Sequence, residues 1–337
     1  MFDVLVTGGA GYVGSHACVA LLNAGYSVII VDDLSNSRFE VISRIKEITG
    51  KKACFYPYDV SDEIEMEKIF SRHNIHCVLH FAGKKAVLES VQIPLDYYKS
   101  NFMSTISLMR VMQRHMVKKL VFSSSAAVYG EQAILPFSED SELSRCYSPY
   151  GWSKWMIEQM MKDVYNSDPD WSIVILRYFN PVGAHPSGRV GEDPQGLPNS
   201  LFPYVMRVLS GRLDYLPIYG ADYNTSDGTG ERDYVHVMDL ARGQVLAFEK
   251  AIQSTGVSLY NMGTGSAHSV LEVIKIFEDI TGKKIPCRLA GKREGDIATS
   301  FASTSKAEKE LGWKATLSLQ QMCEDAWRFQ KMNPTGY

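Results

Sequence analysis

A glycine-rich turn between a strand and a helix constrains the fold of this chain more than any other stretch. Residues 2–7 are apolar and typical of a buried strand, and residues 15–23 are typical of a helix. Between them the spacings G-x-G-x-x-G and G-x-x-G-x-x-G are formed by Gly8, Gly9, Gly11 and Gly14. Such a turn lets a pyrophosphate approach the backbone at a helix N-terminus. The segment therefore predicts a dinucleotide-binding unit.

The next predicted strand, residues 27–31, ends in Asp32, which lies 18 residues after Gly14. A carboxylate at this strand end can accept both hydroxyls of a ribose, and it repels a 2′-phosphate. The turn and the acid together favour NAD over NADP.

Strands and helices then alternate through the first half of the chain. We expect helices at about 39–49, 62–73 and 94–115, and strands at 53–58, 76–81, 118–124 and 172–178. Alternation this regular predicts an α/β protein with a Rossmann-type, doubly wound parallel sheet. Ligands bind outside the carboxyl ends of such strands. Asp32, Asp59, Gly83 and Ser125 all fall there, and Asp59 with Val60 could hold an adenine.

Beyond residue 178 the pattern loosens, because residues 180–200 are rich in glycine and proline. A long irregular loop in a compact protein is usually functional. We expect residues 1–178 to form the NAD-binding domain, with residues 236–255 returning to it. Residues 179–235 and 256–337 should form a smaller, interleaved C-terminal α/β lobe that binds the substrate.

Composition excludes several classes of protein. The 337 residues are 45% hydrophobic and 22% charged with a formal net charge of -3, so neither nucleic acid nor a membrane is expected as a partner. No apolar run approaches the length of a membrane span and no signal peptide is evident, which predicts a cytoplasmic protein. Six scattered cysteines indicate reduced, buried thiols. His76 and His80 lack a third ligand nearby, so no metal site is expected.

Tyr150 and Lys154 stand four residues apart at the start of a predicted helix, and they therefore share one of its faces. An ammonium held close to a phenol lowers the phenol's pKa from about 10. The pair could take a proton from a sugar or alcohol hydroxyl while a hydride leaves the same carbon. Ser125, at the end of the preceding strand, could donate to the developing oxyanion. YxxxK alone also suits an ordinary surface pair.

Taken together, these motifs resemble the extended short-chain dehydrogenase/reductase superfamily. The resemblance rests on the glycine spacing, the Ser123-Ser124-Ser125 run, the YxxxK pair and residues 177–184. Longer strings resemble the UDP-galactose (UDP-glucose) 4-epimerase family in particular, at residues 185–188, 191–194, 227–230, 232–239 and 293–296. The similarity covers essentially the whole chain.

The resemblance implies tightly held NAD⁺ that is regenerated in each turnover of a UDP-sugar. Tyr150 would take the 4-hydroxyl proton, assisted by Ser125 and Lys154, while hydride passes from C4 to the nicotinamide. The keto sugar would turn about its diphosphate linkage before hydride returns to the other face. Guanidinium forks suit a diphosphate, and Arg232 and Arg293 match the family's diphosphate-binding arginines.

By the same resemblance, two sets of residues line the site, and no metal is implied. The cofactor set is Gly8, Gly11, Tyr12, Val13, Gly14, Asp32, Asn36, Asp59, Val60, Phe81, Ala82, Gly83, Lys85, Asn101, Ser123, Tyr150, Lys154 and Tyr178. The substrate set is Lys85, Ser125, Tyr150, Phe179, Asn180, Asn199, Ser200, Leu201, Ile218, Tyr219, Arg232, Arg293, Asp296 and Ser300.

Two positions depart from the family pattern. Ser200 stands where the family commonly has a second asparagine, and a hydroxyl cannot donate as an amide does. Ser300 stands where members restricted to plain hexoses carry a tyrosine beside the sugar C2. Because a serine leaves room for an acetamido group, we expect UDP-GlcNAc and UDP-GalNAc to be interconverted alongside UDP-glucose and UDP-galactose. If Phe301 closes the pocket, a strict UDP-glucose/UDP-galactose epimerase is the alternative.

Other activities fit less well. Nucleotide-sugar 4,6-dehydratases need an acid and a base beside the catalytic hydroxyl, where this chain has Ala126 and Ala127, with Glu131 further on. A UDP-uronate epimerase would need additional cationic capture of the C6 carboxylate, and no clear residue provides it. A catalytically silent NAD- or nucleotide-sugar-sensing protein would typically have lost the Tyr150 and Lys154 pair.

The resemblance also implies a homodimer through two helices, residues 95–115 and the helix of Tyr150. Apolar side chains on these helices could serve the core or the interface equally; they are Met109, Val111, Met112, Met156, Met160 and Met161.

Overall fold

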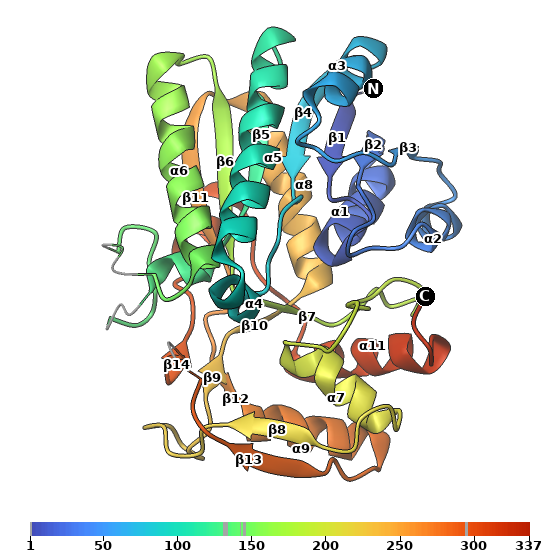
Figure 1. Cartoon of the computed structure of the whole chain (residues 1–337), viewed down its shortest axis with the longest axis vertical. Helices are drawn as coiled ribbons and strands as arrows, with labels where there is room; N and C mark the ends of the chain where they lie inside the picture. The colour runs from blue at the N-terminus through green and yellow to red at the C-terminus, as the bar shows by residue number, and fades with distance from the viewer. Residues whose placement is uncertain (1, 131–133, 142, 144–145, 294–295) are drawn as a thin grey trace.

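A seven-stranded parallel sheet forms the centre of the molecule (Figure 1), and its strand order is β11-β6-β5-β4-β1-β2-β3. The computed structural model describes residues 2–130, 134–141, 143, 146–293 and 296–337. The strands are β1 (Asp3–Thr7), β2 (Ser27–Val31), β3 (Cys54–Tyr56), β4 (Ile75–His80), β5 (Lys119–Ser125), β6 (Ser172–Tyr178) and β11 (Gly256–Met262). This order is that of a doubly wound fold, so the predicted α/β class is confirmed.

Helices cover both faces of the sheet. Successive side chains along a strand point to opposite faces, so the apolar residues of each strand are buried on both sides. Val4 and Val6 of β1 pack into one core, and Leu5 packs into the other. The first core lies under α1 (Tyr12–Asn23), α2 (Glu40–Thr49) and α8 (Val237–Gln253). The second lies under α3 (Glu63–Arg72), α5 (Pro94–Arg114) and α6 (Pro149–Ser167).

Strand β11 corrects one expectation from the sequence. Residues 256–262 were assigned to the C-terminal lobe, but they form the edge strand of the large sheet beside β6, with Tyr260 opposite Leu176. A short apolar strand has the same local pattern in either place, so its pairing could not be predicted from periodicity.

The C-terminal half builds a second group of elements beyond the carboxyl ends of the sheet strands (Figure 1). Its helices α7 (Leu201–Leu209), α9 (Val270–Thr281) and α11 (Leu319–Met332) share a core that includes Phe202, Ile218, Phe277 and Met322. Three small sheets complete it: β10 (Tyr234–His236) with β7 (Asn180–Val182), β12 (His268–Ser269) with β9 (Glu231–Arg232) and β14 (Thr299–Ser300), and β13 (Cys287–Ala290) with β8 (Leu216–Tyr219). The described residues also form the short helices α4 (Val87–Gln92), η1 (Ala126–Tyr129) and α10 (Ser305–Leu311).

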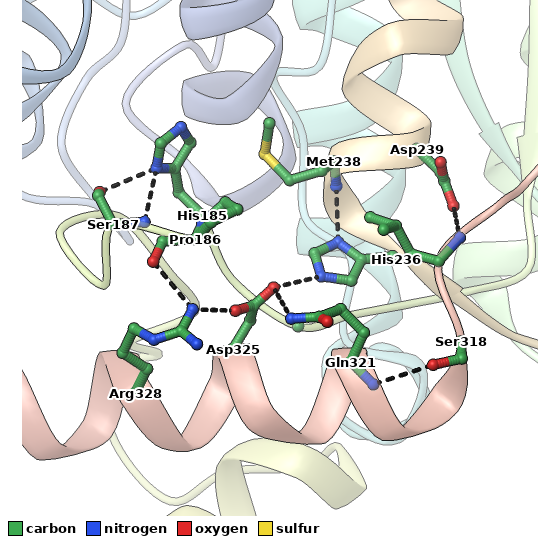
Figure 2. Close-up of polar contacts among 12 residues, drawn as sticks. His185, Pro186, Ser187, His236, Met238, Asp239, Ser318, Gln321, Asp325 and Arg328 are labelled. Atoms are coloured by element: carbon green, nitrogen blue, oxygen red, sulfur yellow. Dashed lines mark hydrogen bonds and ion pairs between the residues drawn. The ribbon is translucent and has the colours of Figure 1, made fainter.

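A buried polar cluster joins this second group to the sheet domain (Figure 2). His236, at the N-cap of α8, contacts the carboxylate of Asp325 on α11 at 3.2 Å, and both side chains are almost fully buried. Asp325 also accepts hydrogen bonds from Gln321 and Arg328, and Arg328 donates to the carbonyl of Pro186 at 2.9 Å. The cluster therefore connects α8, α11 and the loop that follows β7.

Among the described residues, no helix is both long and apolar enough to cross a membrane. All six cysteines have free thiols. Cys18, Cys77, Cys146 and Cys323 are buried as expected, but Cys54 and Cys287 are exposed. Each of these two cysteines is the first residue of a short strand, β3 and β13 respectively.

Candidate active site

The glycine turn packs tightly against the start of α1. Gly8 has a positive φ of 69°, and a Cβ at Gly14 would lie 2.2 Å from the Gly8 carbonyl oxygen. Gly11 is the N-cap of α1 and has no side chain to occupy the helix N-terminus. The first N–H groups of a helix have no partner within it, so those of Tyr12, Val13 and Gly14 suit a phosphate.

Asp32 lies at the tip of β2, beside this turn, and is 7% exposed. Its carboxylate accepts hydrogen bonds from Ala10 N at 3.0 Å, Leu34 N at 3.0 Å and Ser37 Oγ at 2.7 Å. Burial raises the pKa of Asp32, and these three bonds oppose that effect. A carboxylate has about four acceptor sites, so capacity remains for a ribose hydroxyl. The turn and Asp32 together fit the adenosine diphosphate half of NAD.

The remaining residues of the expected adenine side are more dispersed. Asn36 and Asp59 are exposed on the loops that follow β2 and β3. The side chain of Val60 instead packs into the core under α3, at 4% exposure. Only the backbone of Val60 therefore remains available for a contact with an adenine.

Tyr150 is buried in the first turn of α6, beside the end of β5. Ser148 caps this helix by accepting a hydrogen bond from Gly151 N at 3.1 Å, and Pro149 follows at the first helical position. Burial raises the pKa of Tyr150, whereas a hydrogen bond with Ser125 and the charge of Lys85 lower it. The structure thus brings together a phenol, a hydroxyl and an ammonium from three different elements.

Lys154 lies one turn after Tyr150 on α6, and both side chains are buried. Its ammonium donates to the carbonyl of Ser123 at 2.8 Å and lies 4.7 Å from the centre of the Phe122 ring. Burial lowers the pKa of Lys154 to about 8. The charge of Lys85, from the loop after β4, also lowers the pKa of Tyr150. Lys85 belongs to the cofactor and substrate sets expected from the sequence, but no sequence signal indicated its effect on Tyr150, because Lys85 is distant along the chain.

Lys85 itself pairs with Glu192, whose carboxylate lies 2.9 Å from the ammonium. Glu192 belongs to the glycine- and proline-rich loop between β7 and α7, and its charge raises the pKa of Lys85, whose side chain is about half exposed. The sequence indicated this loop as functional but gave no signal for the pair.

Two further cofactor candidates are held by hydrogen bonds. Tyr178, at the end of β6, bonds to Ser123 and accepts from Gln244 of α8, and burial raises its pKa. The Asn101 amide of α5 accepts from Lys84 N at 2.8 Å and donates to Ser153 Oγ at 2.9 Å. Asn101 therefore braces the loop that carries Phe81, Ala82, Gly83 and Lys85 against α6.

The predicted diphosphate residues gather around β9 and the loop before β14. Arg232 donates to Asp296 and to the Ala298 carbonyl at 3.3 Å. The guanidinium of Arg293 stacks over the Tyr219 ring at 3.8 Å, and its buried Nε has no hydrogen-bond partner among the described atoms. An orphaned buried donor on a cationic fork suits an oxyanion of a bound ligand.

Ser300 lies beside these residues on β14, directly opposite Arg232 in the sheet register. It is 8% exposed, and its carbonyl accepts from Asp233 N at 2.9 Å. The other substrate candidates are near β7, α7 and β8: Phe179 and Ile218 are buried, Asn180 and Leu201 are half-buried, and Asn199 and Ser200 are exposed. Glu131, Glu294 and Gly295 lie outside the described residues.

No group of three or more potential metal ligands occurs among the described residues. His80 is held between the hydroxyls of Thr7 at 2.7 Å and Thr105 at 3.0 Å, and His76 accepts from Asp3 N at 3.2 Å. Both imidazoles thus have structural partners.

Comparison with known proteins places this geometry in a class and then in a family. Residues 5–326 match the family described as GDP-mannose 4,6 dehydratase, and the parallel sheet, glycine turn and Tyr150–Lys154 pair define an extended short-chain dehydrogenase/reductase. The chain is 53% identical over 334 residues to UDP-glucose 4-epimerase of Bacillus subtilis, covering 99% of this chain and 98% of that protein. It is 50% identical over 343 residues to UDP-glucose 4-epimerase of Mus musculus, covering 100% and 99%.

Among solved structures, UDP-glucose 4-epimerase from Bifidobacterium longum in complex with NAD⁺ and UDP has a TM-score of 0.97 and 51% identity, covering 99% of this chain and 100% of that one. This chain belongs to the UDP-glucose 4-epimerase family.

Proposed function

We propose that this protein catalyses the NAD-dependent 4-epimerisation of UDP-hexoses. The observation that carries the proposal is the meeting of Ser125, Tyr150 and Lys85 at the carboxyl ends of the parallel strands. The glycine turn and Asp32 lie at the ends of β1 and β2 in the same sheet. Such a constellation suits proton transfer at a carbinol beside a dinucleotide, and full-length similarity to UDP-glucose 4-epimerases supports the same activity.

Each residue has a distinct part in this reaction. NAD, when bound, would supply a group that accepts hydride from C4 of the sugar and returns it. Tyr150 as phenolate takes the proton of the 4-hydroxyl and later gives it back, while Ser125 donates to the sugar oxygen. Lys154 assists Tyr150 from one turn further along α6, and the charge of Lys85 also favours the phenolate. Arg232 and Arg293 hold the diphosphate, which leaves the sugar ring able to turn about that anchor.

The replacement Tyr150→Phe tests the proposal, because it removes only the hydroxyl. We expect the conversion of UDP-galactose to UDP-glucose to fall by about 10²–10⁴-fold, while NAD released from the denatured protein stays the same. Tyr165→Phe, on the same helix, serves as the control and should retain activity. A wild-type protein that binds NAD without turning over any UDP-sugar would instead indicate a nucleotide-sensing protein.

We further propose that the substrate range includes UDP-GlcNAc and UDP-GalNAc. The support is Ser300, a small side chain placed opposite Arg232 on the neighbouring strand. A serine here leaves volume that a tyrosine would fill, and sterics of this kind set specificity by exclusion. The alternative is strict specificity for UDP-glucose and UDP-galactose.

Turnover of UDP-GlcNAc by the wild type and by Ser300→Tyr distinguishes the two. We expect the wild type to epimerise UDP-GlcNAc and the tyrosine variant to lose at least about 10-fold of that activity, with UDP-galactose turnover maintained. Failure of the wild type to use UDP-GlcNAc, or equal use by both proteins, would contradict the proposal that Ser300 leaves room for the acetamido group.

The assembly and division of labour are proposals of the same kind. Residues 179–235, with most of 256–337, would bind the UDP-sugar, and residues 1–178 with 236–255 would bind NAD in a cytoplasmic homodimer. Met109, Val111, Met112 and Met161 are core residues, but Met103 and Met156 are exposed on α5 and α6. These exposed methionines support pairing through α5 and α6, and light scattering of the purified protein should give twice the chain mass.

A further inference from the structure

A buried ion pair lies one helical turn beyond Lys154 and has no part in the chemistry described above. Tyr150, Lys154 and Glu158 follow one another at intervals of four on α6, and all three face the sheet. The Glu158 carboxylate is fully buried and contacts the guanidinium of Arg177, which is also buried. Arg177 lies on β6, in the residue before Tyr178.

The carboxylate of Glu158 contacts both β5 and β6. Its Oε2 accepts from Arg177 Nη2 at 2.6 Å, and its Oε1 accepts from Arg177 Nε at 3.0 Å and from Ser124 Oγ at 2.5 Å. Ser124 of β5 is the register partner of Arg177, and the next pair along the strands is Ser125 with Tyr178. One side chain of α6 is thus bonded to the residue immediately before each of two active-site positions.

The guanidinium of Arg177 also contacts the turn that follows β5. Arg177 stacks on the ring of Tyr129 at 4.7 Å, in the 3₁₀ turn η1. Ser125 is the N-cap of that turn and accepts from Ala127 N at 3.2 Å. The ion pair therefore contacts the segment around Ser125 from both the strand side and the turn side.

We propose that Glu158 and Arg177 are positioning residues that fix α6 in rotation and depth against the ends of β5 and β6, so that Ser125, Tyr150 and Lys154 face one another. Apolar packing of a helix on a sheet is non-directional, and it tolerates small rotations that would separate these groups. A bidentate ion pair has a fixed geometry. The ion pair adds little to the stability of the fold, because the cost of desolvating two charges offsets most of their attraction. Its value therefore lies in its geometry.

The pair has an electrostatic consequence as well. Burial lowers the pKa of Lys154, and the negative charge of Glu158 opposes that effect. His80 of β4 also faces Lys154, but burial lowers the pKa of His80 to about 3, so it is uncharged at neutral pH. Burial raises the pKa of Tyr150, one turn earlier on α6, and so favours its neutral phenol in the unliganded protein. Glu158 is therefore the anion that opposes the effect of burial on the Lys154 ammonium.

The double variant Glu158→Gln with Arg177→Met tests both consequences without leaving an unpaired buried charge. Lysine labelled with ¹³C at Cε reports the pKa of Lys154 by NMR, and the resonance is assigned by its absence in Lys154→Arg. We expect the Lys154 pKa to fall by about one unit. We also expect kcat to fall by about 10- to 100-fold while KM for UDP-galactose changes little.

Ser124→Ala is a milder variant, because it removes the contact of Glu158 with β5 and leaves both charges in place. We expect it to fold with unchanged NAD content and to lose about 3- to 10-fold in kcat. If the double variant fails to fold, an unchanged kcat in Ser124→Ala overturns the proposal. If it does fold, an unchanged Lys154 pKa together with an unchanged kcat overturns it.

The kinetic readout depends on the proposed epimerase function, whereas the NMR titration does not. A protein without any epimerase activity but with a Lys154 pKa that follows Glu158 would contradict the proposed function and leave this electrostatic role standing.

Discussion

At Lys154 an ammonium is buried where the sheet strands end. It has a protein acceptor in the Ser123 carbonyl, and its pKa is lowered to about 8 by burial. A free lysine titrates near 10.4. The folded protein therefore holds fewer protons on this group than the unfolded chain does between about pH 8 and pH 10.4, and its stability must rise with pH in that window.

Lys154→Met should remove this pH dependence. At pH 7 the buried charge costs the wild type about 3 kcal/mol relative to pH 10.4, from a depression of roughly two units and 1.36 kcal/mol per unit. We expect Lys154→Met to have a larger free energy of unfolding than the wild type at pH 8. This difference should shrink by about 3 kcal/mol as the pH rises to 10.4. Urea unfolding of both proteins across this range measures it, and a difference that stays constant with pH would contradict the burial argument.

At the scale of an element, the glycine turn and α1 form one unit. The N–H of Ser15 donates to Gly11 at 2.9 Å, and the N–H of Gly11 donates to Gly8 at 3.1 Å. These short steps bring the helix N-terminus against the end of β1. The absence of a side chain at Gly14 is required by this packing, because the nearest atom to a Cβ there is a backbone oxygen.

Gly14→Ala should therefore displace α1 from the turn. We expect a loss of about 2–3 kcal/mol in stability and loss of most of the NAD that copurifies. Gly291→Ala is the matched control, because no atom lies within 4 Å of a Cβ at that position. Its stability should change by less than about 0.5 kcal/mol. Thermal unfolding and the NAD content of the two variants measure these effects. Equal losses in Gly14→Ala and Gly291→Ala would contradict the packing argument.

For the molecule as a whole, the cluster of Figure 2 connects the two halves of the fold. Burial acts to raise the pKa of Asp325, but hydrogen bonds from His236 and Gln321 and the charge of Arg328 lower it overall. A carboxyl with a lowered folded pKa stabilises the protein above its unfolded pKa, and that stabilisation is lost as the pH falls through the folded pKa.

Asp325→Asn should destabilise the protein by about 3 kcal/mol at pH 7, because Arg328 and His236 lose their common acceptor charge. The deficit should shrink as the pH falls below about 4, because there the carboxyl of the unfolded wild-type chain binds a proton before the folded one does. Glu324→Gln is the control on the same helix, where the carboxylate bonds to Gln320 at 2.9 Å on the exposed side. Unfolding curves at pH 7, 5 and 3 measure the effect, and a deficit independent of pH would contradict it.

Much of this fold could be predicted from local patterns. The strands β2 and β6 have the expected bounds, and most helices end within two residues of the prediction. The errors occur where the local signal is ambiguous. The N-cap of α3 is one example: Ser61 and Asp62 are both residue types that suit an N-cap, and the structure uses Asp62, which accepts from the N–H groups of Ile64 and Glu65.

The sequence by itself determined the alternating elements, the phosphate-binding turn and the chemical groups Ser125, Tyr150 and Lys154, because these depend on spacings within one or two elements. Only the tertiary structure decided that β11 completes the large sheet, that the charge of Lys85 acts on Tyr150, and that Glu158 acts on Lys154 while it pairs with Arg177. Charge interactions depend on distance in space and on the water excluded between groups. Residues far apart in the chain acquire both only when the elements that carry them have packed together.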